Sequence, residues 1–334
     1  MLIVDSLINY FKYGILGNSI RIDASNFCQL RCTSCFYSEG TPPFTKKHLK
    51  FSDFKKFVDQ YPTFKEIELS DNGEIFLNPE LEEIIQYAHS KKVRLTARNG
   101  VNFSSVSEKL LEALVKYQFR ILLVSLDGAS NETYPIYRRG GNFQKIMENI
   151  KEINRYKQQY HSRFPVLVWQ FIVFGHNEHE IPLARRMARE LNMKFFLKFN
   201  TESLYSPIKD PALVRKEMGY ASHTEYEDKT NISYEFSCHQ LWLGPQISPD
   251  GEFLGCSKIN TDHAYGNVFE LGLRPVLKSK KFVYAKRMLR GVEKPREDIP
   301  CFNCNVYRTL RSKRSNLFLT FLFYLRRFKN THHY

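Results

Sequence analysis

Between residues 19 and about 200, the chain alternates short runs of β-branched and aromatic residues with longer amphipathic segments. Such alternation is typical of βα units, in which each strand of a parallel sheet is followed by a covering helix. Parallel strands need right-handed helical crossovers, so six such units favour an α/β fold with a partial (β/α)6 barrel. An open doubly wound sheet is the alternative. The predicted strands are Ser19–Ala24, Glu66–Ser70, Val93–Ala97, Ile121–Leu126, Val166–Phe174 and Lys194–Phe199.

The helices between these strands are predicted to begin at side chains that can accept hydrogen bonds from free backbone N–H groups. The start signals are Ser52 with Asp53, Asn78, Ser104 with Ser107, and Asn177.

Other segments flank the barrel, which covers residues 19–200. They are residues 1–18, an N-terminal helical extension; 201–234, a connecting segment; 235–310, a second unit; and 311–334, a basic amphipathic tail. In the second unit, Leu241–Ser248 and Glu252–Gly255 flank the turn Pro249-Asp250-Gly251, which predicts a β-hairpin, and a helix completes the unit.

The formal charge of the chain is +14, and from Asn305 to Tyr334 there are seven Arg or Lys residues and no Asp or Glu. A basic balance favours anionic partners such as nucleic acid, phosphorylated substrates or a membrane surface, and ordinary solubilising charge is the alternative. The apolar run Asn316–Leu325 is too short to span a bilayer. It suits peripheral contact with a membrane interface or a helix docked on the barrel.

The N-terminus lacks the features of a secretory signal, and no apolar run reaches the roughly 18 residues of a membrane span. We therefore expect a cytoplasmic protein, associated with a membrane surface if the tail binds lipid. Seven cysteines cannot all pair, and a reducing cytosol does not favour disulfides. The cysteine spacing must therefore be interpreted as metal binding or catalysis.

Cys28, Cys32 and Cys35 directly follow the first predicted strand, at the end where parallel barrels build their active sites. Three thiolates at this spacing can bind three irons of a cubane cluster and leave the fourth iron open to a substrate or cofactor. Buried free cysteines or a zinc site are the alternatives. Zinc needs a fourth ligand, and the nearest histidine, His48, lies thirteen residues after Cys35.

This loop resembles the three-cysteine loop of the radical S-adenosylmethionine (SAM) superfamily in spacing and position. Asn72-Gly73-Glu74 resembles the Gly-Gly-Glu motif that holds the amino group of SAM, with Asn72 in place of the first glycine. Arg98-Asn99-Gly100 resembles the Thr-Asn-Gly of many relatives. Val124–Gly128 and Tyr137–Phe143 resemble the fourth-strand segment of the family.

The resemblance implies a set of SAM-contacting residues in these segments. They are Asn72, Gly73, Glu74, Asn99, Ser125, Asp127 and Arg138. By resemblance, Ser125 and Asp127 lie near the ribose and carboxylate of SAM, and Arg138 or Arg139 clamps that carboxylate. Ser34 departs from the family, whose members carry a larger residue beside the last cysteine.

The remaining cysteines are Cys238, Cys256, Cys301 and Cys304, spaced C-x17-C-x44-C-x2-C. The hairpin returns Cys256 toward Cys238, provided that residues 238–243 bend. Four thiolates bind either zinc or a fully coordinated [4Fe–4S] cluster. The hairpin segment resembles the SPASM and Twitch extensions of radical SAM enzymes, and this resemblance favours one auxiliary [4Fe–4S] cluster.

The resemblance implies reductive cleavage of SAM to a 5′-deoxyadenosyl radical, which abstracts hydrogen from a substrate C–H bond. A fully ligated auxiliary cluster suits electron relay, so oxidation of a sugar or aminocyclitol alcohol is the leading expectation. Modification of a ribosomal peptide, modification of RNA, and a non-catalytic zinc-binding interaction protein are the alternatives. With 27 residues before Cys28, there is no room for an N-terminal peptide-recognition domain, which disfavours the peptide alternative.

The expected partners are a sugar-like or peptide substrate and an electron donor, either a reductase or a flavodoxin or ferredoxin. Nucleic acid is the less favoured partner. Gln170, Lys198 and Asn200 are predicted to point into the barrel mouth, where they contact substrate or fill a buried structural role. The sequence identifies neither the substrate nor a general base.

Overall fold

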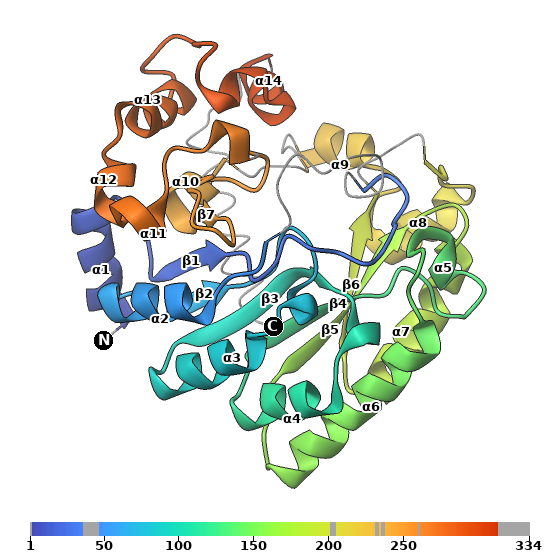
Figure 1. The fold of residues 1–334 in the computed structure, drawn as a ribbon. Helices are drawn as coiled ribbons and strands as arrows, with labels where there is room; N and C mark the ends of the chain where they lie inside the picture. The colour runs from blue at the N-terminus through green and yellow to red at the C-terminus, as the bar shows by residue number, and fades with distance from the viewer. Residues whose placement is uncertain are drawn as a thin grey trace.

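A computed structural model of the chain describes residues 2–35, 47–200, 205–230, 234, 238–259 and 261–312. Its centre is an open parallel sheet in the strand order β6-β5-β4-β3-β2-β1-β7 (Figure 1). The strands are β1 (Ser19–Ile22), β2 (Glu66–Glu68), β3 (Arg94–Val101), β4 (Ile121–Ser125), β5 (Val166–Val173), β6 (Lys194–Phe199) and β7 (Gln246–Ile247). The first six are the predicted strands, with ends that differ by a few residues.

The strand order distinguishes the two predicted architectures. From β1 to β6, neighbours in the chain are also neighbours in the sheet, with no reversal of direction. A doubly wound sheet reverses once and carries helices on both faces, whereas right-handed crossovers in one direction place the helices on one face. Figure 1 shows these helices outside the strands. They are α2 (Phe51–Gln60), α3 (Leu81–Ser90), α4 (Glu108–Lys116), α6 (Phe143–Gln159) and α7 (Ile181–Glu190). The partial barrel is confirmed.

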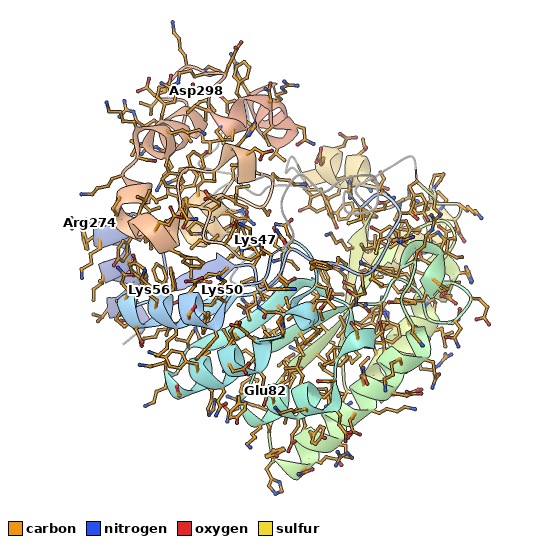
Figure 2. All side chains as sticks on the ribbon, in the orientation of Figure 1. Lys47, Lys50, Lys56, Glu82, Arg274 and Asp298 are labelled. Atoms are coloured by element: carbon orange, nitrogen blue, oxygen red, sulfur yellow. The ribbon has the colours of Figure 1, made fainter. Side chains whose placement is uncertain are left out.

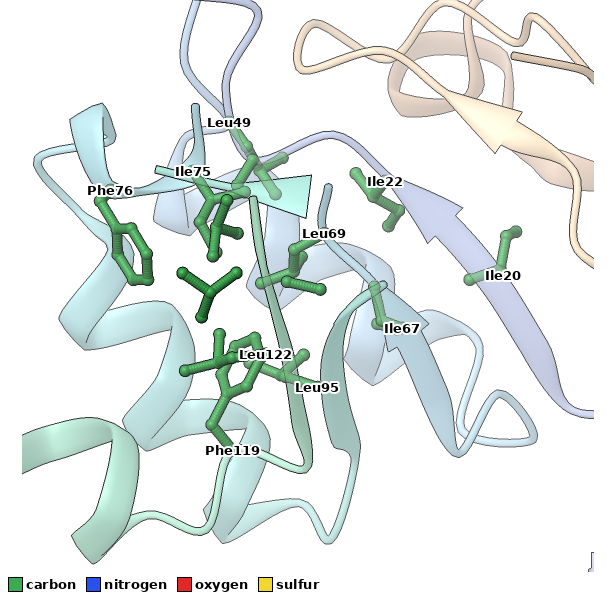
Figure 3. Close-up of a cluster of buried hydrophobic side chains, with 14 of the residues drawn as sticks. Ile20, Ile22, Leu49, Ile67, Leu69, Ile75, Phe76, Leu95, Phe119 and Leu122 are labelled. Carbon is green, nitrogen blue, oxygen red and sulfur yellow. The ribbon is translucent and has the colours of Figure 1, made fainter. Parts of the chain in front are cut away.

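The strands β1 to β3 alternate apolar and polar side chains. Their apolar residues are buried against the helices, and Figure 3 shows Ile20, Ile22, Ile67, Leu69 and Leu95 in this core. Full burial of one such side chain stabilises the fold by about 1.5–3 kcal/mol. The intervening residues face the opposite side of the sheet, which is the barrel interior. They are Arg21, Asp23, Glu66, Glu68, Ser70, Arg94, Thr96 and Arg98. This part of the interior is therefore polar.

The second unit extends the barrel sheet. Strand β7 pairs in parallel with β1, through Arg21 with Gln246 and Ile22 with Ile247. The predicted hairpin is shorter than expected, with one antiparallel bridge between Ile247 and Phe253, and its first arm begins as helix α10 (Gln240–Leu243). This helix supplies the bend that the chain needs between Cys238 and β7.

The second unit also contacts the barrel through lysines at its border. Lys47, after the first cysteine loop, donates to Asp250 in the hairpin turn at 2.8 Å (Figure 2). Lys56 of α2 donates to the Phe269 carbonyl oxygen at 3.1 Å. Helix α1 (Leu2–Tyr13) packs on this unit, and Lys286 donates to the Gly14 carbonyl oxygen at 3.1 Å. These contacts join the two cysteine-bearing parts of the chain.

The predicted helix starts are partly correct. Ser107 caps α4, since its hydroxyl accepts from the Leu110 N–H, and Asn78 accepts from the Glu80 N–H at 2.8 Å just before α3. The start predicted at Ser52 is wrong, because α2 begins at Phe51, whose N–H donates to the Glu80 carboxylate.

The connecting segment contains α8 (Pro211–Met218) and α9 (His223–Thr230). The remaining helices are α5 (Tyr134–Tyr137), α11 (Val268–Leu271), α12 (Leu273–Leu277), α13 (Lys280–Leu289) and α14 (Asn305–Ser312). The predicted tail lies outside the described residues from position 313 onward. In the part of the chain that is described, no helix is both long and apolar enough to cross a membrane.

Candidate functional site

The first three cysteines lie on the loop after β1, and two predicted motif segments hold that loop. The Glu74 N–H donates to the Phe27 carbonyl oxygen at 2.6 Å, immediately before Cys28. On the other side, the Arg31 N–H donates to the Arg139 carbonyl oxygen at 2.9 Å. The fold therefore brings together the cysteine loop, the Asn72-Gly73-Glu74 segment and the Tyr137–Phe143 segment, which are far apart in the sequence.

The three thiols form one electrostatic group. Burial and, to a smaller extent, the negative charges of Glu74, Cys32 and Cys35 raise the pKa of the Cys28 thiol to about 12. The Arg138 Nη1 atom lies 3.6 Å from the Cys32 sulfur. Thiolates in such a site need positive charge beside them, which cluster irons supply. Three thiols, with a guanidinium beside them, fit a [4Fe–4S] cluster in which the thiolates bind three irons and the fourth iron is left for another ligand.

Arg138 is held by Asp127, whose side chain is 0% exposed. One Asp127 oxygen accepts from Arg138 Nε at 2.5 Å, and the other accepts from the Ile172 N–H at 2.7 Å. Asp127 therefore positions Arg138 beside Cys32. Because both of its oxygens have protein partners, direct contact of Asp127 with SAM stays a prediction.

Glu74 and Asn99 are fixed at the ends of β2 and β3. The buried Glu74 carboxylate accepts from the Phe76 and Asn102 N–H groups, and its burial raises its pKa to about 8. Asn99 donates to the Ser70 carbonyl oxygen at 2.6 Å. A cationic amino group arriving beside Glu74 would favour the ionised carboxylate.

Asn72, Ser125 and Gln170, which were also predicted, lie at the same edge of the barrel. Asn72 donates to Asp23 at 3.1 Å. Ser125 is buried at the end of β4, and its hydroxyl lies 2.5 Å from the place where a Cβ on Gly100 would stand. Gln170 also approaches that place, with its Nε2 atom at 3.9 Å, whereas Asn200 donates to the Tyr205 carbonyl oxygen.

Gly73 makes the closest approach to the cysteine loop, with a φ of +73°. A Cβ at this position would lie 2.7 Å from backbone atoms of Asn26 and Phe27. We expect Gly73→Ala to displace the loop and lower the iron content of the first site. Gly219→Ala is the matched control, because Gly219 has a φ of +86° but no atom within 4 Å of its Cβ position. Equal iron loss in both variants, measured after anaerobic reconstitution, would contradict this contact.

The second site gathers the other four cysteines. Cys238 precedes α10, and Cys256 follows the hairpin. Cys301 lies in the 3-10 turn Pro300–Asn303, and Cys304 directly follows that turn, before α14. All four line one cavity of about 390 Å³. Burial raises the pKa of Cys238, and the other three thiols raise it further, so the four groups are close neighbours.

Either predicted occupant needs the four thiols around one space. A zinc ion lies about 2.3 Å from each thiolate and would draw four sulfurs tightly around itself. The cavity of about 390 Å³ is lined by nine further residues besides the four cysteines, and it is large enough for several irons and sulfides. The four cysteines fit an iron–sulfur cluster.

The polar barrel interior beside the first site was not predicted from the sequence. Arg98 donates to Glu66 at 2.7 Å, while Glu68 accepts from Ser70 and Thr96 side chains, both at 2.6 Å. The signal was present in the sequence, because every second residue of β1 to β3 is polar although both faces of a barrel strand are normally buried.

Residues 22–187 match the radical SAM superfamily, and residues 238–305 match SPASM, an iron–sulfur cluster-binding domain. The chain belongs to the radical SAM superfamily. Its cofactors are therefore a [4Fe–4S] cluster and SAM, with auxiliary iron–sulfur binding in the SPASM domain. The family and the cofactors expected from the sequence are confirmed.

Named relatives of this radical SAM protein are distant. A GTP 3′,8-cyclase from Listeria monocytogenes is 24% identical over 235 residues, which are 67% of this chain and 65% of that protein. The GTP 3′,8-cyclase of Lactiplantibacillus plantarum is 26% identical over 150 residues, 42% of this chain and 43% of that protein. The chain therefore matches less than two thirds of the length of these relatives.

Solved structures show the same fold. Streptococcus suis SuiB bound to S-adenosylmethionine has a TM-score of 0.65 at 16% identity, covering 91% of this chain and 75% of SuiB. BtrN in complex with AdoMet and 2-DOIA has a TM-score of 0.50 at 14% identity, covering 86% of this chain and 92% of BtrN. At such identities the likeness shows the fold alone.

Proposed function

We propose that this radical SAM protein is a dehydrogenase that converts a hydroxyl-bearing carbon of a sugar-like substrate into a carbonyl. The observation that carries the proposal is the second site, where four cysteines line one cavity. A cluster with a thiolate on every iron has no open position for substrate and serves to move electrons. Net oxidation of a substrate requires such a route for the electron.

In this proposal, Cys28, Cys32 and Cys35 hold the catalytic cluster, and the four later cysteines hold the auxiliary one. The catalytic cluster with SAM supplies a 5′-deoxyadenosyl radical when both are bound. The chain itself binds and orients the SAM amino-acid group, with Glu74 and Asn99 toward the amino end and Arg138 toward the carboxylate.

In the proposed reaction, the substrate is oxidised in two steps: it first loses a hydrogen atom, and it then loses a proton and an electron. The carbinol carbon loses a hydrogen atom to the 5′-deoxyadenosyl group, which leaves a hydroxyalkyl radical. That radical then loses its hydroxyl proton to a base and one electron to the auxiliary site, so the C–O bond becomes C=O. The polar interior of β1 to β3 suits a substrate that carries several hydroxyl groups, because each can exchange hydrogen bonds with fixed partners.

A peptide substrate is the second candidate. It is favoured by the likeness to Streptococcus suis SuiB, which has also been crystallised with the precursor peptide SuiA and has a TM-score of 0.63 in that form. We also include GTP as a test substrate because of the cyclase relatives.

The test is an anaerobic assay of reconstituted enzyme with SAM, a reductant and panels of sugars and aminocyclitols, peptides, and GTP. We expect 5′-deoxyadenosine together with an aldehyde or ketone from the first panel. Formation of 5′-deoxyadenosine with peptides or GTP, and of no carbonyl product from any sugar, would overturn the proposal. A flavodoxin, a ferredoxin or their reductase is the proposed electron donor, and membrane contact of residues 311–334 stays a prediction.

A further inference from the structure

Two carboxylates stand at the barrel mouth where β1 and β2 end. Asp23 is 1% exposed, and one of its oxygens accepts from Asn72 Nδ2 at 3.1 Å. The other Asp23 oxygen is buried and has no hydrogen-bond partner. Asp71, next to Asn72 in the chain, lies with its Oδ1 atom 3.9 Å from Arg21 Nη1 and keeps 15% of its side chain exposed.

Asp23 differs from the neighbouring Glu68 because one of its carboxylate oxygens has no hydrogen-bond partner. Both oxygens of the neighbouring Glu68 have partners among the Ser70, Thr96 and Arg98 groups. A buried polar atom without a partner costs free energy, and such atoms in native folds commonly serve binding or catalysis. The empty acceptor on Asp23 is therefore a position for a hydrogen from a ligand or from a protonated neighbour.

Two lysines from different parts of the chain lie near Asp71. Lys198 at the end of β6 and Lys258, two residues after Cys256, are both close enough to lower its pKa. One lysine comes from the far edge of the barrel sheet and the other from the auxiliary-cluster unit. Asp71, just after β2, therefore lies near a lysine from each of the two cysteine-bearing parts of the chain.

We infer that Asp71 is the base that takes the hydroxyl proton of the substrate, and that Asp23 is a positioning residue that holds the adjacent Asn72 through the hydrogen bond at 3.1 Å. This inference rests on the proposed dehydrogenase function. In the step, the O–H bond of the hydroxyalkyl radical breaks, its proton goes to an Asp71 oxygen, and the electron goes to the auxiliary cluster as C=O forms. Before the step, Lys198 and Lys258 are close enough to Asp71 to stabilise the negative charge of its ionised carboxylate.

The charges around Asp71 set the pH at which it can accept a proton. Burial raises its pKa to about 6, and Glu68 raises it, while Arg21, Lys258 and Lys198 oppose that rise. The Asp71 charge in turn helps to raise the pKa of Asp23. Because only the ionised form is a base, oxidation is expected to increase with pH up to about 6 and to level off above it, with about a tenfold loss per unit below.

The test compares Asp71→Asn and Asp71→Glu with the exposed control Asp228→Asn in the reconstituted holoenzyme. With a sugar that wild type oxidises, carrying deuterium on the reacting carbon, we expect Asp71→Asn to keep its iron and its deuterium transfer into 5′-deoxyadenosine. Its carbonyl product should fall by about 100-fold or more, since a general base contributes that much. Asp71→Glu should recover part of the product with a shifted pH profile, and Asp228→Asn should match wild type.

An independent readout uses infrared difference spectra of the holoenzyme without substrate. We expect wild type to show a protonated-carboxyl band that disappears with a midpoint near pH 6 and is absent from Asp71→Asn. Normal oxidation by Asp71→Asn with the wild-type pH profile, or a band that the substitution leaves unchanged, would overturn the inference alone. A wild-type enzyme that oxidises no alcohol overturns the proposed function, and the inference with it.

Discussion

Cys32→Ala is expected to abolish SAM cleavage while leaving the auxiliary cluster in place. Cys32 is buried between the other two thiols of the first site and lies 3.6 Å from Arg138 Nη1. Loss of one of three ligands leaves a cubane cluster with too few thiolates to be retained. Iron should fall from about eight to about four per chain, and 5′-deoxyadenosine should no longer be detected.

Cys301→Ala is the matched control, because Cys301 is equally buried but belongs to the second site. This variant should lose similar iron and still cleave SAM, while its carbonyl product disappears because the electron has no acceptor. If Cys301→Ala also lost SAM cleavage and Cys32→Ala kept it, the assignment of the two sites would be reversed.

Arg138→Ala is expected to give the largest loss of stability among substitutions near the first site. Arg138 is the cation that pairs with Asp127, which is 0% exposed. Removing one partner of a buried ion pair costs about 3–5 kcal/mol, because the other charge is left without compensation. The free energy of unfolding should fall by about that amount in urea titrations, and SAM binding should weaken in the same variant.

Two further variants separate these effects. Arg155→Ala removes an arginine from an exposed ion pair with Glu152 and should leave the unfolding free energy within error of wild type. The double variant Asp127→Asn with Arg138→Ala removes the orphaned charge, so it should regain stability without regaining SAM binding. A double variant no more stable than Arg138→Ala would contradict the buried-charge explanation.

The barrel and the place of the first cysteine loop could be predicted from the sequence because both depend on local patterns. The runs of β-branched residues gave six strands in the correct order, and Cys28 follows the first of them. Motif segments after β2, β3 and β4 are then neighbours, since the carboxyl ends of parallel strands meet at one edge.

Other features depend on contacts that no local pattern contains. Strand β7 has two residues, too few for a periodic signal, and its pairing with β1 is a long-range contact. The bend between Cys238 and β7 depends on the four-residue helix α10. The four later cysteines line one cavity only in the folded chain, and Asp23 became a candidate only when its missing hydrogen-bond partner was known.

Electron paramagnetic resonance of the reduced, reconstituted protein tests the central claim most directly, namely that the site of Cys28, Cys32 and Cys35 leaves one iron free to bind SAM. Addition of SAM should change the signal of one cluster and not the other, and the SAM-sensitive signal should be absent from Cys32→Ala. A protein with a full complement of iron whose spectrum does not respond to SAM would contradict the account.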